Sequence, residues 1–201
     1  MNTLHLEQDI VIHFVELERI FALPKANFDS LREYQQAKKS QIHQYRLEKL
    51  SDFSGQTILA SDMLVSNYGK PYLDFLFFNH SHSQKHYALA MSKTCQDLGV
   101  DIEDLDRKVR FETLAQHAFH ADEMQLWQQN QQEKTLWFKI WTAKEAVLKA
   151  SGLGIRLNLS QLNTQVDPQK NIGFCAHPQI GQFKFQHIEY ANCMLTVAWR
   201  V

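Results

Sequence analysis

Residues 133–150 have the sequence EKTLWFKIWTAKEAVLKA, and this stretch decides how the rest of the chain is interpreted. Its apolar residues recur every three or four positions, which predicts an amphipathic helix over 132–150. With about 100° between successive residues, Lys144 falls at the centre of the apolar stripe. An unpaired buried ammonium is costly, so we expect Lys144 either to find a partner or to snorkel with its stem on apolar surface. The stripe consists of Leu136, Trp137, Ile140, Trp141, Val147 and Leu148.

Glu145 and Lys149 lie on one flank of this stripe, four residues apart. That spacing is typical of an ordinary helical ion pair, which stabilises a helix by only about 0.2–0.5 kcal/mol. A chemical role for both residues is the alternative. Directly after the helix, Gly152 suits a left-handed C-cap.

Upstream of the helix, residues 99–104 have the sequence GVDIED, and we expect a strand over 98–102. Residues two apart in a strand share a face, so Asp101 and Glu103 would place two carboxylates side by side. Neighbouring like charges repel, and a hard divalent cation such as Mg²⁺ relieves that repulsion. The plainer interpretation is a strand that ends in a solvated acidic loop.

Further upstream, a Ser/His-rich segment, Asn79 to Ser83, follows a predicted strand over 74–78 and the turn Gly69 to Pro71. Hydroxyls and imidazoles at a strand end can bind a phosphate, although a single histidine is more often structural. No GxSxG elbow surrounds Ser81 or Ser83, which argues against a serine hydrolase.

The order of predicted elements repeats along the chain. It predicts an α/β (α+β) fold of two similar halves, residues 1–93 and 94–201, with a ligand cleft between them. The first half contains a strand over 9–17, helices over 31–50 and 56–65, and strands over 74–78 and 87–92. The second contains the strand over 98–102, helices over 111–129 and 132–150, and strands near 172–175, 183–188 and 193–199.

Composition excludes several classes of protein. With 201 residues, 44% hydrophobic, the chain is neither disordered nor a coiled coil. A formal net charge of -1 gives no basic field for nucleic acid, so any anion must be met by a local cluster. Three cysteines without ligand spacing, a polar N-terminal segment and the lack of a long apolar run predict a reduced, cytoplasmic protein without a membrane span.

Four segments, taken in order, resemble the motifs of the Sfp-type 4′-phosphopantetheinyl transferases. They are Gly69 to Pro71 (GKP), Asn79 to Ser83 (NHSHS), Gly99 to Glu103 (GVDIE) and Trp141 to Lys149 (WTAKEAVLK). The resemblance implies a monomeric pseudo-dimer of two α/β halves that binds coenzyme A between them. Such an enzyme uses Mg²⁺ to transfer the phosphopantetheine arm to a serine of an apo acyl or peptidyl carrier protein and releases 3′,5′-ADP.

The resemblance also assigns roles to residues. Asp101, Glu103 and Glu145 match the Mg²⁺ ligands. From the chemistry of the residues, our hypothesis is that Glu145, directly or through a metal-bound water, is the base for the attacking serine. Lys144 and Lys149 match residues near that serine and the pyrophosphate, with Lys144 orienting Glu145. Ser81 and His82 match the coenzyme A phosphate contact, and Lys70 with Pro71 the adenine-side turn.

One position departs from the family pattern. Where the family commonly has an arginine for the 3′-phosphate, at the start of the helix before the Gly-Lys-Pro turn, this chain has Gln56. Arg46 and Lys49 are the candidate substitutes.

Carrier proteins are generally acidic, so the basic cluster of Arg107, Lys108 and Arg110 is a candidate docking surface, with a solvated loop as the alternative. Two other functions stay open. A metal-dependent phosphodiesterase would use the same carboxylates and lysines for attack by water. A catalytically silent carrier-binding protein would keep the fold alone.

Overall fold

The computed structural model describes residues 2–66, 69–153 and 156–201. The first half of the chain contains β1 (Asn2–His5), β2 (Val11–Glu16), α1 (Leu31–Ser54), β3 (Leu64–Val65), β4 (Pro71–Tyr72), β5 (Phe77–His82) and β6 (His86–Ser92). The second contains β7 (Leu98–Asp104), α2 (Phe111–Ala118), α3 (Ala121–Gln129), α4 (Lys134–Ser151), the 3₁₀ turn η5 (Leu159–Gln161), β8 (Ile172–His177), β9 (Gly181–Tyr190) and β10 (Cys193–Arg200).

Each half contains a four-stranded antiparallel sheet, and the first half also contains the two-stranded sheet β3-β4. The two larger sheets share a three-stranded arrangement, β2-β6-β5 and β7-β10-β9. The first sheet has the order β1-β2-β6-β5 and the second β7-β10-β9-β8. In both halves a first strand (β2 or β7) leads to a long helix (α1 or α4) and then to a hairpin whose last strand pairs with the first. The mixed fold and the repeated element order that the sequence predicts are therefore present.

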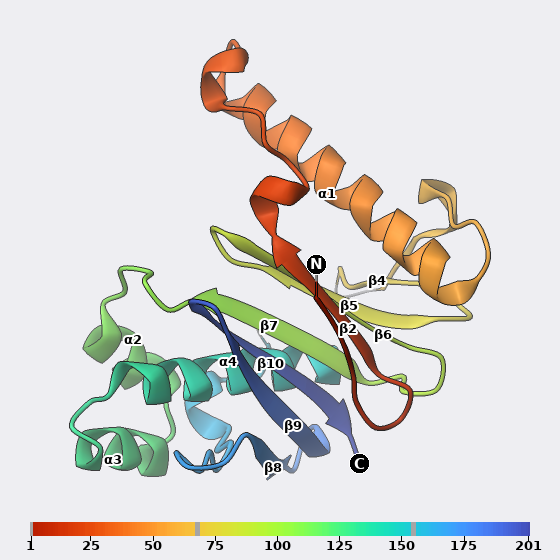
Figure 1. The fold of residues 1–201 in the computed structure, drawn as a ribbon. Coiled ribbons are helices and arrows are strands. Elements are labelled where there is room, and N and C mark those ends of the chain that lie inside the picture. The colour runs from red at the N-terminus through yellow and green to blue at the C-terminus, as the bar shows by residue number, and fades with distance from the viewer. Residues whose placement is uncertain (1, 67–68, 154–155) are drawn as a thin grey trace.

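The molecule is layered, with α1 on the outer face of the first sheet and α4 on the outer face of the second (Figure 1). Period-two alternation along each strand separates the cores. In β6, for example, Leu89 packs toward α1, whereas Ala88 and Ala90 face the second sheet. The core between the sheets combines Ile12 and Phe14 of the first half with residues of β7 and β10.

At Gly99, α4 and β7 approach each other closely. A Cβ placed on Gly99 would lie 2.1 Å from the Ala146 carbonyl oxygen and 2.4 Å from the Ala150 nitrogen. Glycine is therefore required at Gly99, because only its hydrogen leaves room for the helix backbone. This contact fixes the height of α4 above the strand that carries Asp101.

Several expected boundaries were wrong. Residues 56–65 form no α-helix, because Gly55 ends α1 in a left-handed conformation with φ +80°, and the chain continues through a short 3₁₀ turn into β3. The expected helix over 111–129 breaks at Phe119, an extended and buried residue, before α3 begins with a capping box at His120 and Glu123. β1 was not anticipated.

Two further expectations concern strand and helix ends. The strand expected over 74–78 is β5, Phe77–His82, so the Ser/His-rich segment lies inside a strand rather than after one. Gly152 ends α4 with φ +72°, which confirms the predicted left-handed C-cap. In the described part of the chain, no helix is both long and apolar enough to cross a membrane.

Candidate active site

The two sheets meet edge to edge at β5 and β7, and side chains rather than backbone pairs join them. Asn79 accepts a hydrogen bond from the Val100 amide at 2.9 Å, and Ser81 donates to Asp101 at 2.9 Å. Ser83 donates to Asp104 at 2.7 Å. Because alternate residues of a strand share a face, the Asn-x-Ser-x-Ser pattern places three polar groups in one row. That row connects the two halves of the chain.

Lys149 extends from α4 to this row. Its ammonium donates to Asp101 Oδ1 at 2.7 Å, to Ser81 Oγ at 2.9 Å and to the Val100 carbonyl at 3.2 Å. The side chain of Lys149 is 29% exposed and that of Asp101 is 7% exposed, so the ion pair opens to solvent on the lysine side. Asp101 Oδ2 is buried and has no hydrogen-bond partner among the described residues. One carboxylate oxygen is therefore left available to a ligand.

Glu145 lies one turn before Lys149 on the same helix. Burial raises the pKa of its carboxyl above the ordinary value, the charge of Asp101 raises it further, and Lys149 opposes both. Burial also raises the pKa of Glu103, against a hydrogen bond from Arg107 that lowers it. These shifts show that the three predicted carboxylates, Asp101, Glu103 and Glu145, are close enough to repel one another.

The carboxylates do not form a closed metal cluster in this arrangement. Across residues 2–66, 69–153 and 156–201, no group of three or more His, Cys, Asp or Glu side chains is positioned to hold a metal ion. Two of the predicted ligands are turned to cations, Asp101 to Lys149 and Glu103 to Arg107. Their donor set still fits Mg²⁺, because all the ligands are carboxylate oxygens and Asp101 Oδ2 lacks a partner.

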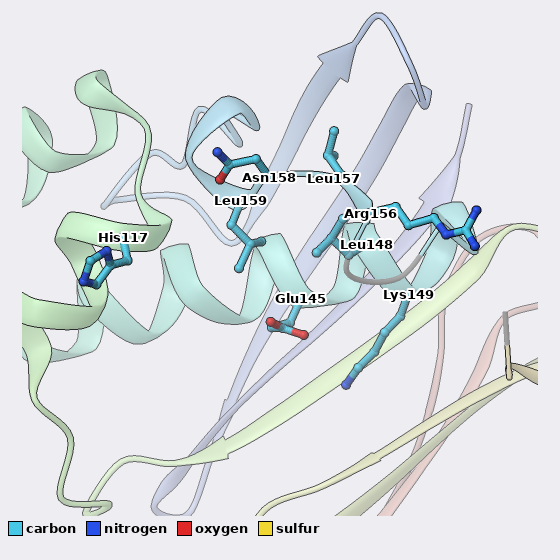
Figure 2. Close-up of a pocket in the computed structure, with 8 residues that line it drawn as sticks. All are labelled: His117, Glu145, Leu148, Lys149, Arg156, Leu157, Asn158 and Leu159. Atoms are coloured by element: carbon cyan, nitrogen blue, oxygen red, sulfur yellow. The ribbon is translucent and has the colours of Figure 1, made fainter.

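A pocket of about 540 Å³ opens beside Glu145 and Lys149 (Figure 2). His117 of α2 forms one side, and the chain that follows α4 forms another. The lining combines apolar groups with a few polar and charged groups, as small-molecule sites generally do. It consists of His117, Glu145, Leu148, Lys149, Arg156, Leu157, Asn158 and Leu159.

Lys70 connects the first half to the C-terminal end of α4. Its ammonium donates to the Leu98 carbonyl at 3.2 Å and to the Lys149 carbonyl at 3.0 Å, and burial lowers its pKa. Pro71 follows in β4, paired with Val65. Lys70 lines a second pocket, of about 290 Å³, together with aromatic residues and the last turn of α4.

Lys144 is not brought to the carboxylates. It is completely buried, and its ammonium lies 2.7 Å from Glu123 of α3. The partner that its place on the apolar stripe requires is therefore Glu123. The expected orientation of Glu145 by Lys144 is absent, because all of the described hydrogen bonds of this ammonium go to Glu123 and to the carbonyls of Leu159 and Leu162.

A second basic cluster lies between α1 and the first sheet. Arg46 is buried and donates to His80 Nε2 and to His43 Nδ1. Burial, followed by the charge of Arg46, lowers the pKa of His80 to about 3. His80 therefore stays neutral, and because its Nε2 accepts from Arg46, its proton lies on Nδ1.

Sequence reasoning did not single out His80 or Tyr87. Both belong to this cluster, with ring centroids 5.9 Å apart. Arg46 Nε, His80 Nδ1 and the Tyr87 hydroxyl are all buried and have no partner among the described residues. All three are potential donors. The sequence did contain a signal for this cluster, because His80 lies two residues before His82 and therefore on the same face of the strand.

The other predicted residues lie nearer the surface. His82 is exposed at the end of β5, with Nδ1 3.3 Å from the Ser83 carbonyl oxygen. Lys49 is engaged on α1 by Glu48 at 2.9 Å and Asp52 at 2.8 Å. Gln56 is exposed just after α1. In the basic cluster after β7, Lys108 and Arg110 are exposed, whereas Arg107 is the partner of Glu103.

Comparison with known proteins relates the chain to one family of transferases. The sequence model of the 4′-phosphopantetheinyl transferase superfamily matches residues 97–198, about half of the chain. The chain is 33% identical over 102 residues to the 4′-phosphopantetheinyl transferase gsp of Aneurinibacillus migulanus, an alignment that covers 47% of this chain and 40% of that protein. It is 40% identical over 82 residues to the 4′-phosphopantetheinyl transferase HetI of a Nostoc species, covering 40% of this chain and 34% of HetI.

A longer alignment reaches into the first half. A putative 4′-phosphopantetheinyl transferase of Haemophilus influenzae is 28% identical over 160 residues, which cover 76% of this chain and 67% of that protein. Against gsp and HetI, the chain spans less than half the length of the relative. The region matched by the superfamily runs from β7 to β10 and contains Asp101, Glu145 and Lys149.

Proposed function

The chain belongs to the 4′-phosphopantetheinyl transferase superfamily, and we propose that it transfers the 4′-phosphopantetheine group of coenzyme A to a serine of an apo acyl or peptidyl carrier protein. The observation that carries the proposal is the contact of Lys149, Ser81 and Asp101 at the junction of the two halves, beside the pocket that contains Glu145. A cation, a hydroxyl and carboxylates around one open pocket suit the transfer of a phosphoryl group.

The proposed reaction is a displacement at the phosphorus that carries the pantetheine arm. The carrier serine oxygen forms a bond to that phosphorus, and the bond from phosphorus to the bridging oxygen breaks, so that 3′,5′-ADP leaves. Glu145 takes the serine proton. Its raised pKa supports this role, because a carboxylate with a higher pKa is a better base.

Lys149 has the position to neutralise phosphate charge in this step. Its ammonium is partly exposed and is held by Asp101 and Ser81 rather than by an i–4 partner on its own helix. Asp101, Glu103 and Glu145 would hold Mg²⁺, which when bound supplies a charge that stabilises the pyrophosphate oxygens. A cation at this place also relieves the repulsion from Asp101 and Glu103 that adds to the effect of burial on the pKa of Glu145.

Coenzyme A has three chemically different parts, and we assign each to a place. The adenine lies in the pocket lined by Lys70 and Tyr72, on either side of Pro71 in sequence, and the pantetheine arm in the pocket beside Glu145. His82 contacts a phosphate. For the 3′-phosphate, Arg46 is favoured over Lys49, because Lys49 is already engaged by two carboxylates, whereas Arg46 Nε, His80 Nδ1 and the Tyr87 hydroxyl have no partner among the described residues.

The proposal includes the organisation of the whole chain. Residues 1–93 and 94–201 act as two halves of one catalytic unit that works as a monomer. Three free and buried cysteines support a reducing compartment such as the cytoplasm.

The test is a mass measurement of apo-carrier proteins after incubation with the chain, coenzyme A and Mg²⁺. We expect a gain of one phosphopantetheine and an equal amount of 3′,5′-ADP. Release of 3′,5′-ADP without a carrier, and without a change in carrier mass, would instead establish a phosphodiesterase. Binding of a carrier with neither product would establish a silent binding protein.

A further inference from the structure

Three of the four lysines of α4, Lys139, Lys144 and Lys149, are spaced five residues apart and reach three different places. Lys139 donates to carbonyls of the chain near Pro168, Lys144 to Glu123 and the chain near Leu159, and Lys149 to Asp101. We propose that Lys144 is a positioning residue, whose buried ammonium holds residues 156–164 in place as the wall of the pocket beside Glu145. The identity of the ligand, coenzyme A, rests on the proposed function.

The first step is that every N–H donor of the Lys144 ammonium has a partner. Lys144 donates to the Leu159 carbonyl at 2.8 Å and to the Leu162 carbonyl, and it lies 2.7 Å from Glu123 Oε2. A lysine has three donors, and all three have partners here. Two of the three partners are backbone oxygens of one segment, so Lys144 fixes the path of that segment.

The second step is the attachment of the same segment to α3. Glu123 Oε1 accepts from the Thr164 amide at 2.8 Å and from the Thr164 hydroxyl at 2.6 Å, while Oε2 accepts from the His120 amide at 2.8 Å. Glu123 is 2% exposed and Thr164 is completely buried. The ion pair between Lys144 and Glu123 therefore links α4, α3 and the segment in one buried network.

The third step connects this network to the pocket. Leu157, Asn158 and Leu159 line the pocket together with Glu145, and Figure 2 shows these three residues above the Glu145 side chain. The carbonyl that Lys144 binds belongs to Leu159 itself. Lys144 and Glu145 are adjacent in sequence. Glu145 lines the pocket, and Lys144 holds Leu159, another residue of its lining.

The wall would contact the pantetheine arm, which coenzyme A has and 3′,5′-ADP lacks. Loss of the tether should therefore weaken the binding of coenzyme A more than that of 3′,5′-ADP. General destabilisation does not make this distinction, because both ligands contain the same nucleotide.

The test variant is Lys144→Met with Glu123→Gln, which removes both charges and leaves no unpaired buried ion. The matched control is Lys139→Met. Like Lys144, Lys139 is buried, and it donates to three oxygens of a loop, those of Pro168, Lys170 and Asn171. Unlike the segment held by Lys144, that loop does not line the pocket beside Glu145. Calorimetry measures the affinity for coenzyme A and for 3′,5′-ADP, and hydrogen exchange measures the amides of residues 156–164.

We expect the double variant to bind coenzyme A about ten-fold more weakly, with unchanged affinity for 3′,5′-ADP and faster exchange over 156–164. Lys139→Met should change neither affinity. Equal changes for the two ligands, or unchanged exchange, would overturn the proposal.

Two further measurements keep the result interpretable. If the double variant does not fold, Thr164→Val loosens the same segment while keeping the ion pair, and a selective loss of a few-fold in coenzyme A affinity is expected. The wild type is assayed in parallel for carrier modification. A wild type that binds coenzyme A but modifies no carrier contradicts the proposed function, whereas the affinity and exchange comparison still decides the role of Lys144.

Discussion

The two long helices of the molecule take equivalent places in the chain but differ in how they are used. α1 has 24 residues, of which only Ile42, Arg46 and Leu50 are buried, and much of it extends beyond the sheet (Figure 1). α4 has 18 residues, and twelve of them are buried. A helix that is buried on most sides can hold a reactive side chain at a fixed height, whereas an exposed helix can only cover one face of a sheet. Two of the proposed catalytic groups, Glu145 and Lys149, are accordingly on α4.

We expect the largest effect from variants that break the ion pair between Lys149 of α4 and Asp101 of β7. Asp101→Asn and Lys149→Met should each lower carrier modification at least about 100-fold, because each removes one charge of the pair at the junction of the halves. The measurement is the rate of holo-carrier formation at saturating coenzyme A and Mg²⁺. Lys139→Met is the control, and near-normal turnover of either site variant would remove these residues from the mechanism.

The second prediction concerns the closeness of α4 to its strand. Gly99→Ala should destabilise the protein by about 3 kcal/mol, because the new Cβ would collide with the backbone of the helix at Ala146 and Ala150. Urea unfolding gives the free energy. In Gly55→Ala, at the end of α1, the Cβ meets no atom within 4 Å, and only its left-handed backbone costs about 1 kcal/mol. Equal costs at the two glycines would mean that α4 can shift without loss.

The third prediction tests a likeness between the halves. His80 in β5 and His187 in β9 lie on equivalent strands, and burial is the largest cause that lowers the pKa of each to about 3. Arg46 lowers the first further, and Lys139 the second. The unfolded chain binds a proton near pH 6.5 and the folded chain does not, so stability falls as the pH is lowered from about 6.5 toward 3.

Removing either imidazole should reduce this acid sensitivity. Between pH 7 and pH 5, we expect the wild type to lose about 2 kcal/mol more than His80→Gln or His187→Gln loses. Unfolding free energies at both pH values provide the measurement. A parallel pH dependence in the wild type and a variant would mean that the histidine concerned is protonated in the folded protein.

The smallest expected effect lies on the surface. Lys108→Glu with Arg110→Glu should slow the association of an acidic carrier by a few-fold at low salt, with little change at saturating carrier, since exposed charges act on encounter. Arg107 is excluded from the pair because it binds Glu103. Arg32→Glu with Lys39→Glu, on exposed positions of α1, is the control. If both pairs act alike, net charge rather than a docking surface is responsible.

The local pattern predicted most of the helices and strands, because α4 and the strands of the second half carry strong periodicity. It failed over 56–65, where apolar spacing favoured a helix but Gly55 had already ended α1. Lys144 was predicted to need a partner, yet nothing in the pattern identified Glu123, which lies on a separate helix. The same limit applies to Asn79 and Ser81, whose partners Val100 and Asp101 lie across the junction of the two sheets. Contacts between distant segments depend on the assembled fold.

The row of side-chain hydrogen bonds between β5 and β7 has a consequence for folding cooperativity. Ser81 takes part both in joining the halves and in holding Lys149, so separation of the sheets and loss of the site are one event. By thermodynamic linkage, a ligand that binds only the assembled site stabilises the docking of one half on the other. Coenzyme A should therefore protect the whole molecule against partial unfolding, including the edge strand β1 outside the proposed site, rather than only the residues it touches.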